Sequence, residues 1–247
     1  MDNRMSPFAQ AGQQQYVHVA DPATTRAFLS RVFSYMSMAL VLSGLAAWIF
    51  GTTPALFAYL FDLTTGKQTI LGWVVLLAPL GLVFVMGGLM QRLSATAMVG
   101  VFALYSILTG MSISYIFLMY TLTSIASIFF ITAAVFGTMA IAGYTTKTDL
   151  TKLGSILFIG LIGIVIAGLV NMFLRSDTMG YVISMLSVVI FTGLTAYDMQ
   201  RLKGIAGEVI PGTDTMQKLA LMGALSLYLN FLNLFLSLLR LFGGRRD

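Results

Sequence analysis

The chain has 247 residues, of which 58% are apolar and 9% are charged. A soluble domain carries about 25% charged residues on average, so this chain has too little polar surface to cover a water-soluble globule. Its hydrophobicity excludes disorder, and the absence of cysteine excludes a disulfide scaffold, thiol catalysis and thiolate metal sites. The net charge of +5 is spread over the predicted loops, so we predict a lipid bilayer and no nucleic acid as partner.

The first 27 residues are polar and include three consecutive glutamines, Gln13 to Gln15. They contain no apolar run like that of a secretory signal peptide. We predict a disordered polar cytoplasmic tail over residues 1–27. The single histidine, His18, lies in this tail, which leaves no histidine for a buried catalytic or metal site.

Seven continuous apolar runs follow, each close to the roughly 20 residues that a helix needs to cross a bilayer. Continuous runs favour helices over the alternating strands of a barrel. We predict an all-α membrane protein with a seven-helix transmembrane domain over 28–243 and a short basic tail over 244–247. The short run 55–61 predicts one interfacial turn of helix. The predicted spans are 32–50, 70–90, 95–115, 125–144, 153–174, 179–197 and 219–241.

The lysines and arginines predict the orientation. Those of the N-terminal tail and of the loops after spans two, four and six outnumber those of the other loops, which places the N-terminus in the cytoplasm. The C-terminal arginines 240, 245 and 246 disagree, so either span seven is re-entrant or the rule is locally broken. The compact loops favour a bacterial plasma membrane, with an organelle membrane as the alternative. The cytoplasmic set is Arg4, Arg26, Arg31, Arg92, Lys147, Lys152, Arg201, Lys203 and Lys218.

Asp198 is the acidic residue nearest to membrane depth, at the end of span six. One interpretation is a solvated carboxylate at the helix end. In the other, the helix continues to Gly204 while Arg201 and Lys203 reach the surface, which places Asp198 roughly 9 Å deep. A carboxylate at that depth is a candidate proton switch or cation ligand.

Span seven carries small and polar residues at steps of three and four, which places them on one helical face. Such a stripe does not face lipid. It indicates either helix packing through small residues and hydrogen bonds, or a central helix that lines a polar path. The stripe consists of Gly223, Ser226, Asn230, Asn233 and Ser237.

Several enzyme classes lack their residues here. There is no phosphate-binding loop, no metalloprotease His-Glu-x-x-His motif and no lysine within span seven for retinal. Tyr197-Asp198 matches one half of the aspartyl intramembrane protease site, but Asp214 lies in a predicted turn and does not supply the second catalytic carboxylate. We therefore predict that the protein is not an enzyme.

Three segments resemble the Bax inhibitor family, also called the transmembrane Bax-inhibitor-motif family. They are Gly-Tyr-Thr-Thr-Lys-Thr-Asp-Leu at 143–150, Phe-Thr-Gly-Leu-Thr-Ala-Tyr-Asp at 191–198, and residues 225–235 of span seven. They keep their family order, and the resemblance covers 31–242. It implies a seven-helix fold in which the seventh helix is surrounded by the other six.

The resemblance also implies a pH-sensitive cation leak, usually discussed for calcium, in which carboxylates of helices six and seven form a paired proton sensor. The first matches Asp198, and the second falls at Asn230, an amide. We therefore expect one proton-sensing carboxylate, weaker divalent binding with Asp198 as the candidate metal ligand, and Arg92 as a candidate ion-pair partner. Pro79 takes the place where family members often carry an acidic residue.

Two functions follow. The first is a leak channel without a cofactor, gated by protonation of Asp198 and movement of span two, with calcium as the transported ion. The second is a non-transporting regulator that binds a membrane protease or a cell-death or stress factor. Asn230 favours the regulator, and the polar stripe favours the channel.

Overall fold

The computed structural model describes residues 22–62, 65 and 67–246. Within them, seven helices are long and apolar enough to cross a membrane, which confirms the predicted fold class. These are α1 (Pro22–Thr52), α3 (Ile70–Gly88), α4 (Ala95–Ile113), α6 (Leu122–Thr145), α7 (Thr151–Leu174), α8 (Asp177–Ala206) and α9 (Asp214–Phe242). The shorter elements are α2 (Pro54–Leu60), α5 (Ile116–Met119) and the two-residue strands β1 (Phe61–Asp62) and β2 (Lys67–Gln68), which pair antiparallel.

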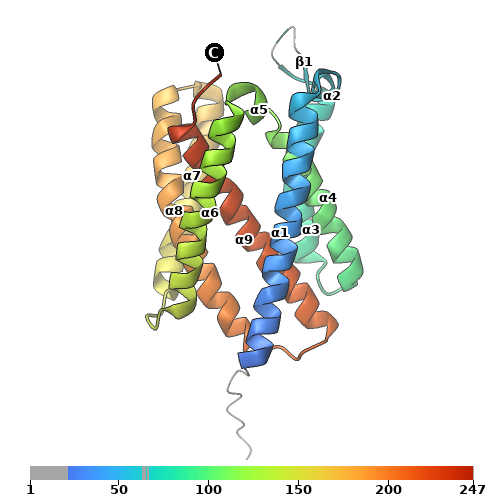
Figure 1. Ribbon diagram of the computed structural model, residues 1–247, viewed down its shortest axis with the longest axis vertical. Helices are drawn as coiled ribbons and strands as arrows, with labels where there is room; N and C mark the ends of the chain where they lie inside the picture. The colour runs from blue at the N-terminus through green and yellow to red at the C-terminus, as the bar shows by residue number, and fades with distance from the viewer. Residues whose placement is uncertain (1–21, 63–64, 66, 247) are drawn as a thin grey trace, which may run out of the picture.

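The helices form two groups of three with α9 between them (Figure 1). One group contains α1, α3 and α4, and the other contains α6, α7 and α8. The central helix packs mainly on α1, α4, α6 and α8, while α3 lies outside on α4 and α7 lies outside on α8. Within the most apolar 18-residue stretch of α9, 67% of the residues are buried, against 11% in the corresponding stretch of α7. The seventh span is therefore the central helix, as predicted, with four close neighbours and two outer helices.

The ends of the first and sixth spans differ from the prediction. Helix α1 begins at Pro22, so residues 22–27 belong to this helix and not to the predicted tail. Proline suits a first helical position because its missing N–H has no helical partner there. The rest of the predicted tail lies outside the described residues. Helix α8 continues to Ala206, which extends it nine residues beyond the predicted end at Tyr197.

The short segments between the first two long helices agree with the prediction in part. The predicted interfacial helical turn is α2. The β1–β2 hairpin was not predicted, because two-residue strands are too short to show an alternating pattern.

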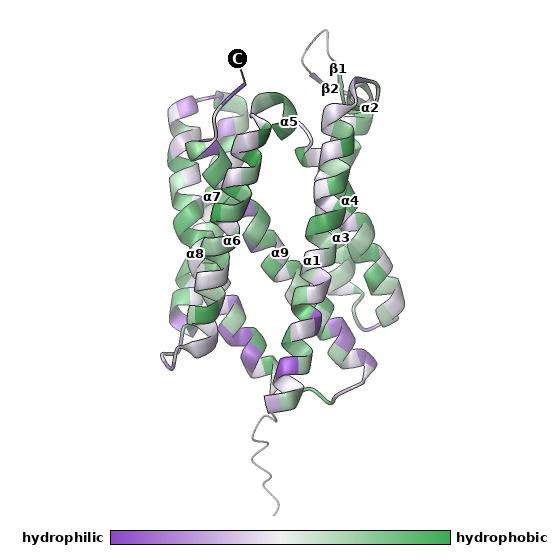
Figure 2. Cartoon of the chain, viewed as in Figure 1, coloured by the Kyte–Doolittle hydropathy of each residue, from purple (hydrophilic) through white to green (hydrophobic). Residues whose placement is uncertain are grey.

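Figure 2 shows apolar residues along the spans and polar residues gathered near the helix ends, as a bilayer requires. The start of α1 and the C-terminus lie at opposite ends of the bundle (Figure 1). Helix α9 runs unbroken from one end to the other, so it is a full crossing and not re-entrant. The C-terminal arginines are thus a local exception to the charge rule.

The tail after α9 is held at that far end. Gly244 accepts a hydrogen bond from Thr121 N at 3.1 Å, and Arg246 N donates to Met119 O at 3.0 Å. The basic tail predicted over 244–247 is therefore fixed to the connection between α5 and α6 in its described part.

Pro79 lies inside α3 and is accommodated by the neighbouring helix. A proline lacks the N–H that would bond the carbonyl four residues earlier, here that of Val75. Ser112 of α4 donates its hydroxyl to Val75 O at 2.8 Å. This bond satisfies the freed carbonyl within the membrane, where no water is available.

Helices α6 and α8 approach closely at Gly143, the first residue of the first resemblance segment. A Cβ at this position would overlap the backbone of Ala196. Glycine is therefore required there by the packing of two backbones. Gly137, six residues earlier in the same helix, has open space where a Cβ would stand.

These two glycines provide a matched test of the packing. We expect Gly143→Ala to destabilise the protein by about 1–3 kcal/mol, because two backbones must move apart. Gly137→Ala should be neutral or stabilising by up to about 1 kcal/mol, because alanine favours helix. Thermal unfolding in detergent measures both. Equal midpoints for the two variants would contradict the close approach.

Candidate functional site

Asp198 is a buried residue inside α8. Its side chain is 7% exposed, and the helix continues for two more turns toward the cytoplasmic end. At 1.5 Å per residue it lies about 12 Å from that end. The structure thus supports the buried carboxylate and not the solvated one.

Two residues of the predicted stripe bind this carboxylate. Ser226 Oγ donates to Asp198 Oδ2 at 2.6 Å, and Asn230 Nδ2 donates to the same oxygen at 2.8 Å. The donors are four residues apart, so they lie one turn apart on the same face of α9. Asn230 stands beside Asp198, where the resemblance placed the second carboxylate. Both hydrogen bonds go to Oδ2 and leave Oδ1 as the oxygen available to a ligand.

No cation neutralises Asp198 among the residues that the structure describes. The one ion pair within 4.0 Å in this part of the chain joins Lys218 and Asp214, at 2.6 Å. Arg92 is exposed in the turn after α3 and forms no ion pair with Asp198, so the predicted pairing is absent from this structure. Arg201 lies one turn after Asp198 and is exposed. Its charge reaches Asp198 from a distance rather than through contact.

Three cavities follow the polar face of α9. The largest, about 810 Å³, lies between α3, α7, α8 and α9 and is lined by Asp198, Ser226 and Asn230. A second, about 250 Å³, lies between the cytoplasmic ends of α8 and α9 and shares Asp198 with the first. A third, about 410 Å³, lies near the opposite end, and Asn233 lines both it and the first cavity. Each of the three cavities is lined by residues of the stripe.

Two further polar residues of the stripe bond to their own helix. Asn233 Nδ2 donates to Leu229 O at 2.8 Å, and Ser237 Oγ donates to Asn233 O at 2.7 Å. Both also line the third cavity. The stripe therefore takes part in hydrogen bonding and also lines cavities.

The site offers a metal ion few protein ligands. The described residues contain no group of three or more His, Cys, Asp or Glu that could hold a metal. Asp198 would supply one charged oxygen, and Asn230 could add only the uncharged oxygen of its amide. A divalent ion binds best where several carboxylates meet. The site suits transient contact with a cation better than tight binding.

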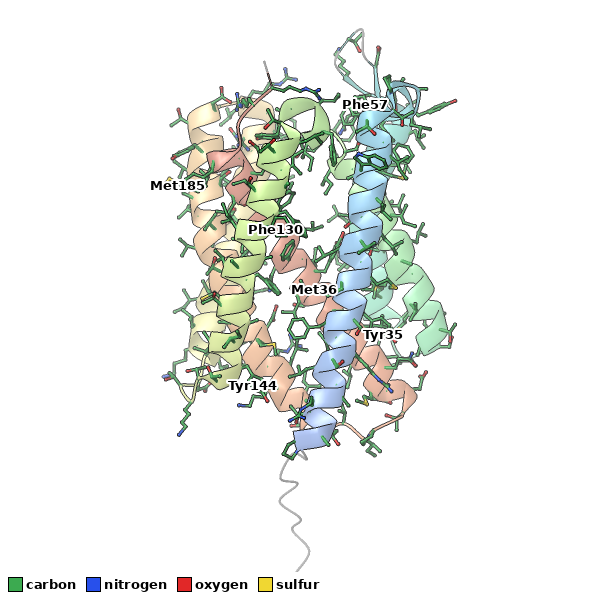
Figure 3. The ribbon with its side chains drawn as sticks, viewed as in Figure 1. Tyr35, Met36, Phe57, Phe130, Tyr144 and Met185 are labelled. Carbon is green, nitrogen blue, oxygen red and sulfur yellow. The ribbon has the colours of Figure 1, made fainter. Side chains whose placement is uncertain are left out.

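The cytoplasmic end of α8 holds the first resemblance segment in place. Gln200 accepts from Leu150 N at 2.8 Å and donates to Thr148 O at 2.8 Å. Lys203 Nζ donates to Tyr144 O at 2.8 Å and lies 4.8 Å from the centre of its ring, at the lower end of α6 (Figure 3). Sequence reasoning missed Gln200 and Lys203 as partners, because no local pattern relates residues 50 or more apart.

The loop before α7 contains a second carboxylate, outside the membrane span. Asp149 Oδ1 accepts from Thr151 N at 2.9 Å and from Thr151 Oγ1 at 2.6 Å. These hydrogen bonds hold the pKa of Asp149 below its ordinary value. Asp149 thus satisfies the backbone N–H of Thr151, the first residue of α7, and stays ionised at neutral pH.

Comparison with known proteins identifies the family. The sequence model for "Inhibitor of apoptosis-promoting Bax1" matches residues 25–247. The chain belongs to the Bax inhibitor family. It is 44% identical over 226 residues to "Inner membrane protein YbhL" of Escherichia coli K12, covering 91% of this chain and 94% of that protein. It is also 44% identical over 226 residues to the uncharacterized protein RP147 of Rickettsia prowazekii, covering 90% and 91%.

A more distant relative, an uncharacterized membrane protein of Streptococcus pyogenes serotype M6, is 37% identical over 226 residues, covering 89% of this chain and 93% of its own. The protein is a multi-pass membrane protein. The inner-membrane relative and the seven apolar helices together confirm the predicted bacterial inner membrane.

Proposed function

We propose that this protein is a cation leak channel of the bacterial inner membrane, with Asp198 as its single proton-responsive group and calcium among the ions that pass. The observation that carries the proposal is a buried carboxylate with no ion-pair partner in the described part of the chain, set between two cavities on the polar face of α9. An unpaired carboxylate within a membrane is costly, which favours a functional role.

The chemistry follows from the charge of Asp198. The ionised carboxylate attracts a cation, while Ser226 and Asn230 hold its orientation. Protonation removes the attraction and converts Oδ2 or Oδ1 into a hydroxyl donor. Arg201 is the charged residue that lines the same cavity, and Tyr105 and Tyr197 are its other titratable residues. One carboxylate gives a response to one proton, without the shared proton of a pair.

The outer helix α3 is the candidate moving part. It packs on α4 and α2 and leaves most of its surface unburied, and Pro79 has already replaced one of its internal hydrogen bonds by a bond from Ser112. Pro79 also lines the large cavity. A tilt of α3 would therefore change the cavity beside Asp198 at small cost in packing.

The test is potassium and calcium flux into proteoliposomes that hold the purified protein, between mildly acidic and mildly basic pH. We expect the parent's flux to change with pH as the titration curve of a single group. Asp198→Asn keeps the shape of the side chain but is neutral at every pH. Its flux should therefore be independent of pH and equal to the flux of the parent when Asp198 is protonated. Asp149→Asn is the control, because it removes a carboxylate outside the cavities.

The alternative is a regulator without transport, which binds a membrane protease or a cell-death or stress factor. It is favoured by the amide at position 230, which deprives the site of its second carboxylate. Pure protein separates the two functions, because a regulator needs its partner. Flux no greater than that of empty vesicles at every pH would reject the channel and leave the regulator.

A further inference from the structure

The large cavity is open toward the bilayer as well as toward Asp198. Its walls include α3 and α7, which belong to different helix groups on either side of α9 and do not pack on each other (Figure 1). The rim carries long apolar side chains on the outer surface of both helices. Phe84 of α3 is 79% exposed, and Ile159 of α7 is 70% exposed. These residues lie within the membrane spans, so the opening faces lipid.

The chemistry inside this opening is that of an amphipathic site. Most of its lining is apolar, with the aromatic rings of Tyr105, Phe158 and Phe191 among the walls. The polar groups are gathered at α8 and α9, around the carboxylate of Asp198. A volume of about 810 Å³ is within the range of sites for drug-sized molecules, about 300–1,000 Å³.

Charge and shape together select the ligand. A hydrated inorganic ion would find one carboxylate and no ring of oxygens to replace its water. An anion that reached the inside of the cavity would meet the buried carboxylate of Asp198, because Arg201, the other charged residue of the lining, is exposed. An organic cation with a hydrocarbon or aromatic body satisfies both parts, because its body covers the apolar walls and its charge meets Asp198 and the aromatic faces.

We infer that the cavity binds a monovalent lipophilic organic cation, which enters from the bilayer between α3 and α7 and places its charge against Asp198. The inference deepens the proposed function by naming a ligand class for the same carboxylate, and it rests on that carboxylate being accessible to cations. Binding itself requires no ion flux.

The experiment is equilibrium binding of tetraphenylphosphonium to the purified full-length protein in detergent at neutral pH. We expect one bound cation per chain, and an affinity about tenfold or more weaker in Asp198→Asn. Asp149→Asn should bind like the parent, because it removes the same charge from an exposed loop residue outside the cavity lining. Triphenylphosphine oxide, which has similar rings without the charge, should bind weakly and equally in parent and Asp198→Asn.

Two tryptophan variants of α7 test the same cavity without changing Asp198. Ser155 lines the cavity on an exposed position of α7, so Ser155→Trp narrows the opening and should weaken binding about tenfold. Ile156 is an exposed residue of the same helix outside the lining, on the face turned away from Phe158 and Val165, so Ile156→Trp should leave binding unchanged. The melting temperature of each variant checks that it is folded.

Equal binding in parent and Asp198→Asn, or no difference between the two tryptophan variants, would overturn the inference. The experiments distinguish failure of this inference from failure of the proposed leak channel. Ion flux without phosphonium binding overturns this inference and leaves the channel, whereas phosphonium binding without ion flux overturns the channel and leaves the site.

Discussion

Asn230→Asp should bind calcium at least about tenfold more tightly than the parent protein. The new carboxylate would stand beside Asp198, in the place from which Asn230 Nδ2 now donates at 2.8 Å. At an effective dielectric constant of about 20, a unit charge 4 Å from another contributes about 4 kcal/mol, and desolvation removes part of this gain. Titration calorimetry with calcium measures the affinity.

The same variant should change the response to pH. Two adjacent carboxylates cannot both ionise freely, so the pair releases its protons in two separated steps. In calcium-free buffer its melting temperature should therefore fall as the pH rises, because the second ionisation creates like-charge repulsion. The parent has one buried carboxylate and no repelling neighbour, so its fall should be smaller. Calcium should restore the stability of the variant.

Asn233→Asp is the matched control for charge. It adds the same carboxylate to the same helix and to the wall of the same cavity, three residues beyond Asn230. Asn233 bonds to Leu229 O and not to Asp198, so the added charge is not paired with the existing one. Calcium affinity raised equally by both substitutions would show that a general negative potential is responsible, and not a pair at Asp198.

Asn233→Leu should reduce ion flux about tenfold or more, which corresponds to about 1.4 kcal/mol in the barrier. Asn233 is the residue that lines both the large cavity and the cavity toward the opposite end of α9. An apolar side chain at this junction would exclude water and create a hydrophobic constriction. Flux into proteoliposomes at a fixed pH measures the effect.

Asn233→Ser is the control at the same position. It shortens the side chain but keeps a polar group able to bond to the carbonyl of Leu229, so flux should stay near that of the parent. Phosphonium binding should survive in both variants, because Asp198 and the opening between α3 and α7 are unchanged. Undiminished flux in Asn233→Leu would show that ions do not pass along this face of α9.

Much of the fold could be predicted from the chain, because its strongest signal is local. A run of about 20 apolar residues must form its own backbone hydrogen bonds in lipid, so each run becomes a helix wherever it stands. The ends were less predictable. The nine residues added to α8 beyond Tyr197 are partly polar and resemble a loop. They continue the helix, in which Gln200 bonds to the loop after α6 and Lys203 to the end of α6.

The sequence by itself determined the membrane class, the seven spans and the family, because these depend on composition and on motifs read in order. That Asp198 lies near Asn230 was an implication of the family resemblance. The tertiary structure decided how the residues meet. It placed Ser226 and Asn230 on one oxygen of Asp198, left Arg92 unpaired with it, and opened the large cavity between α3 and α7. Those features depend on distances between helices far apart in the chain, which only packing sets.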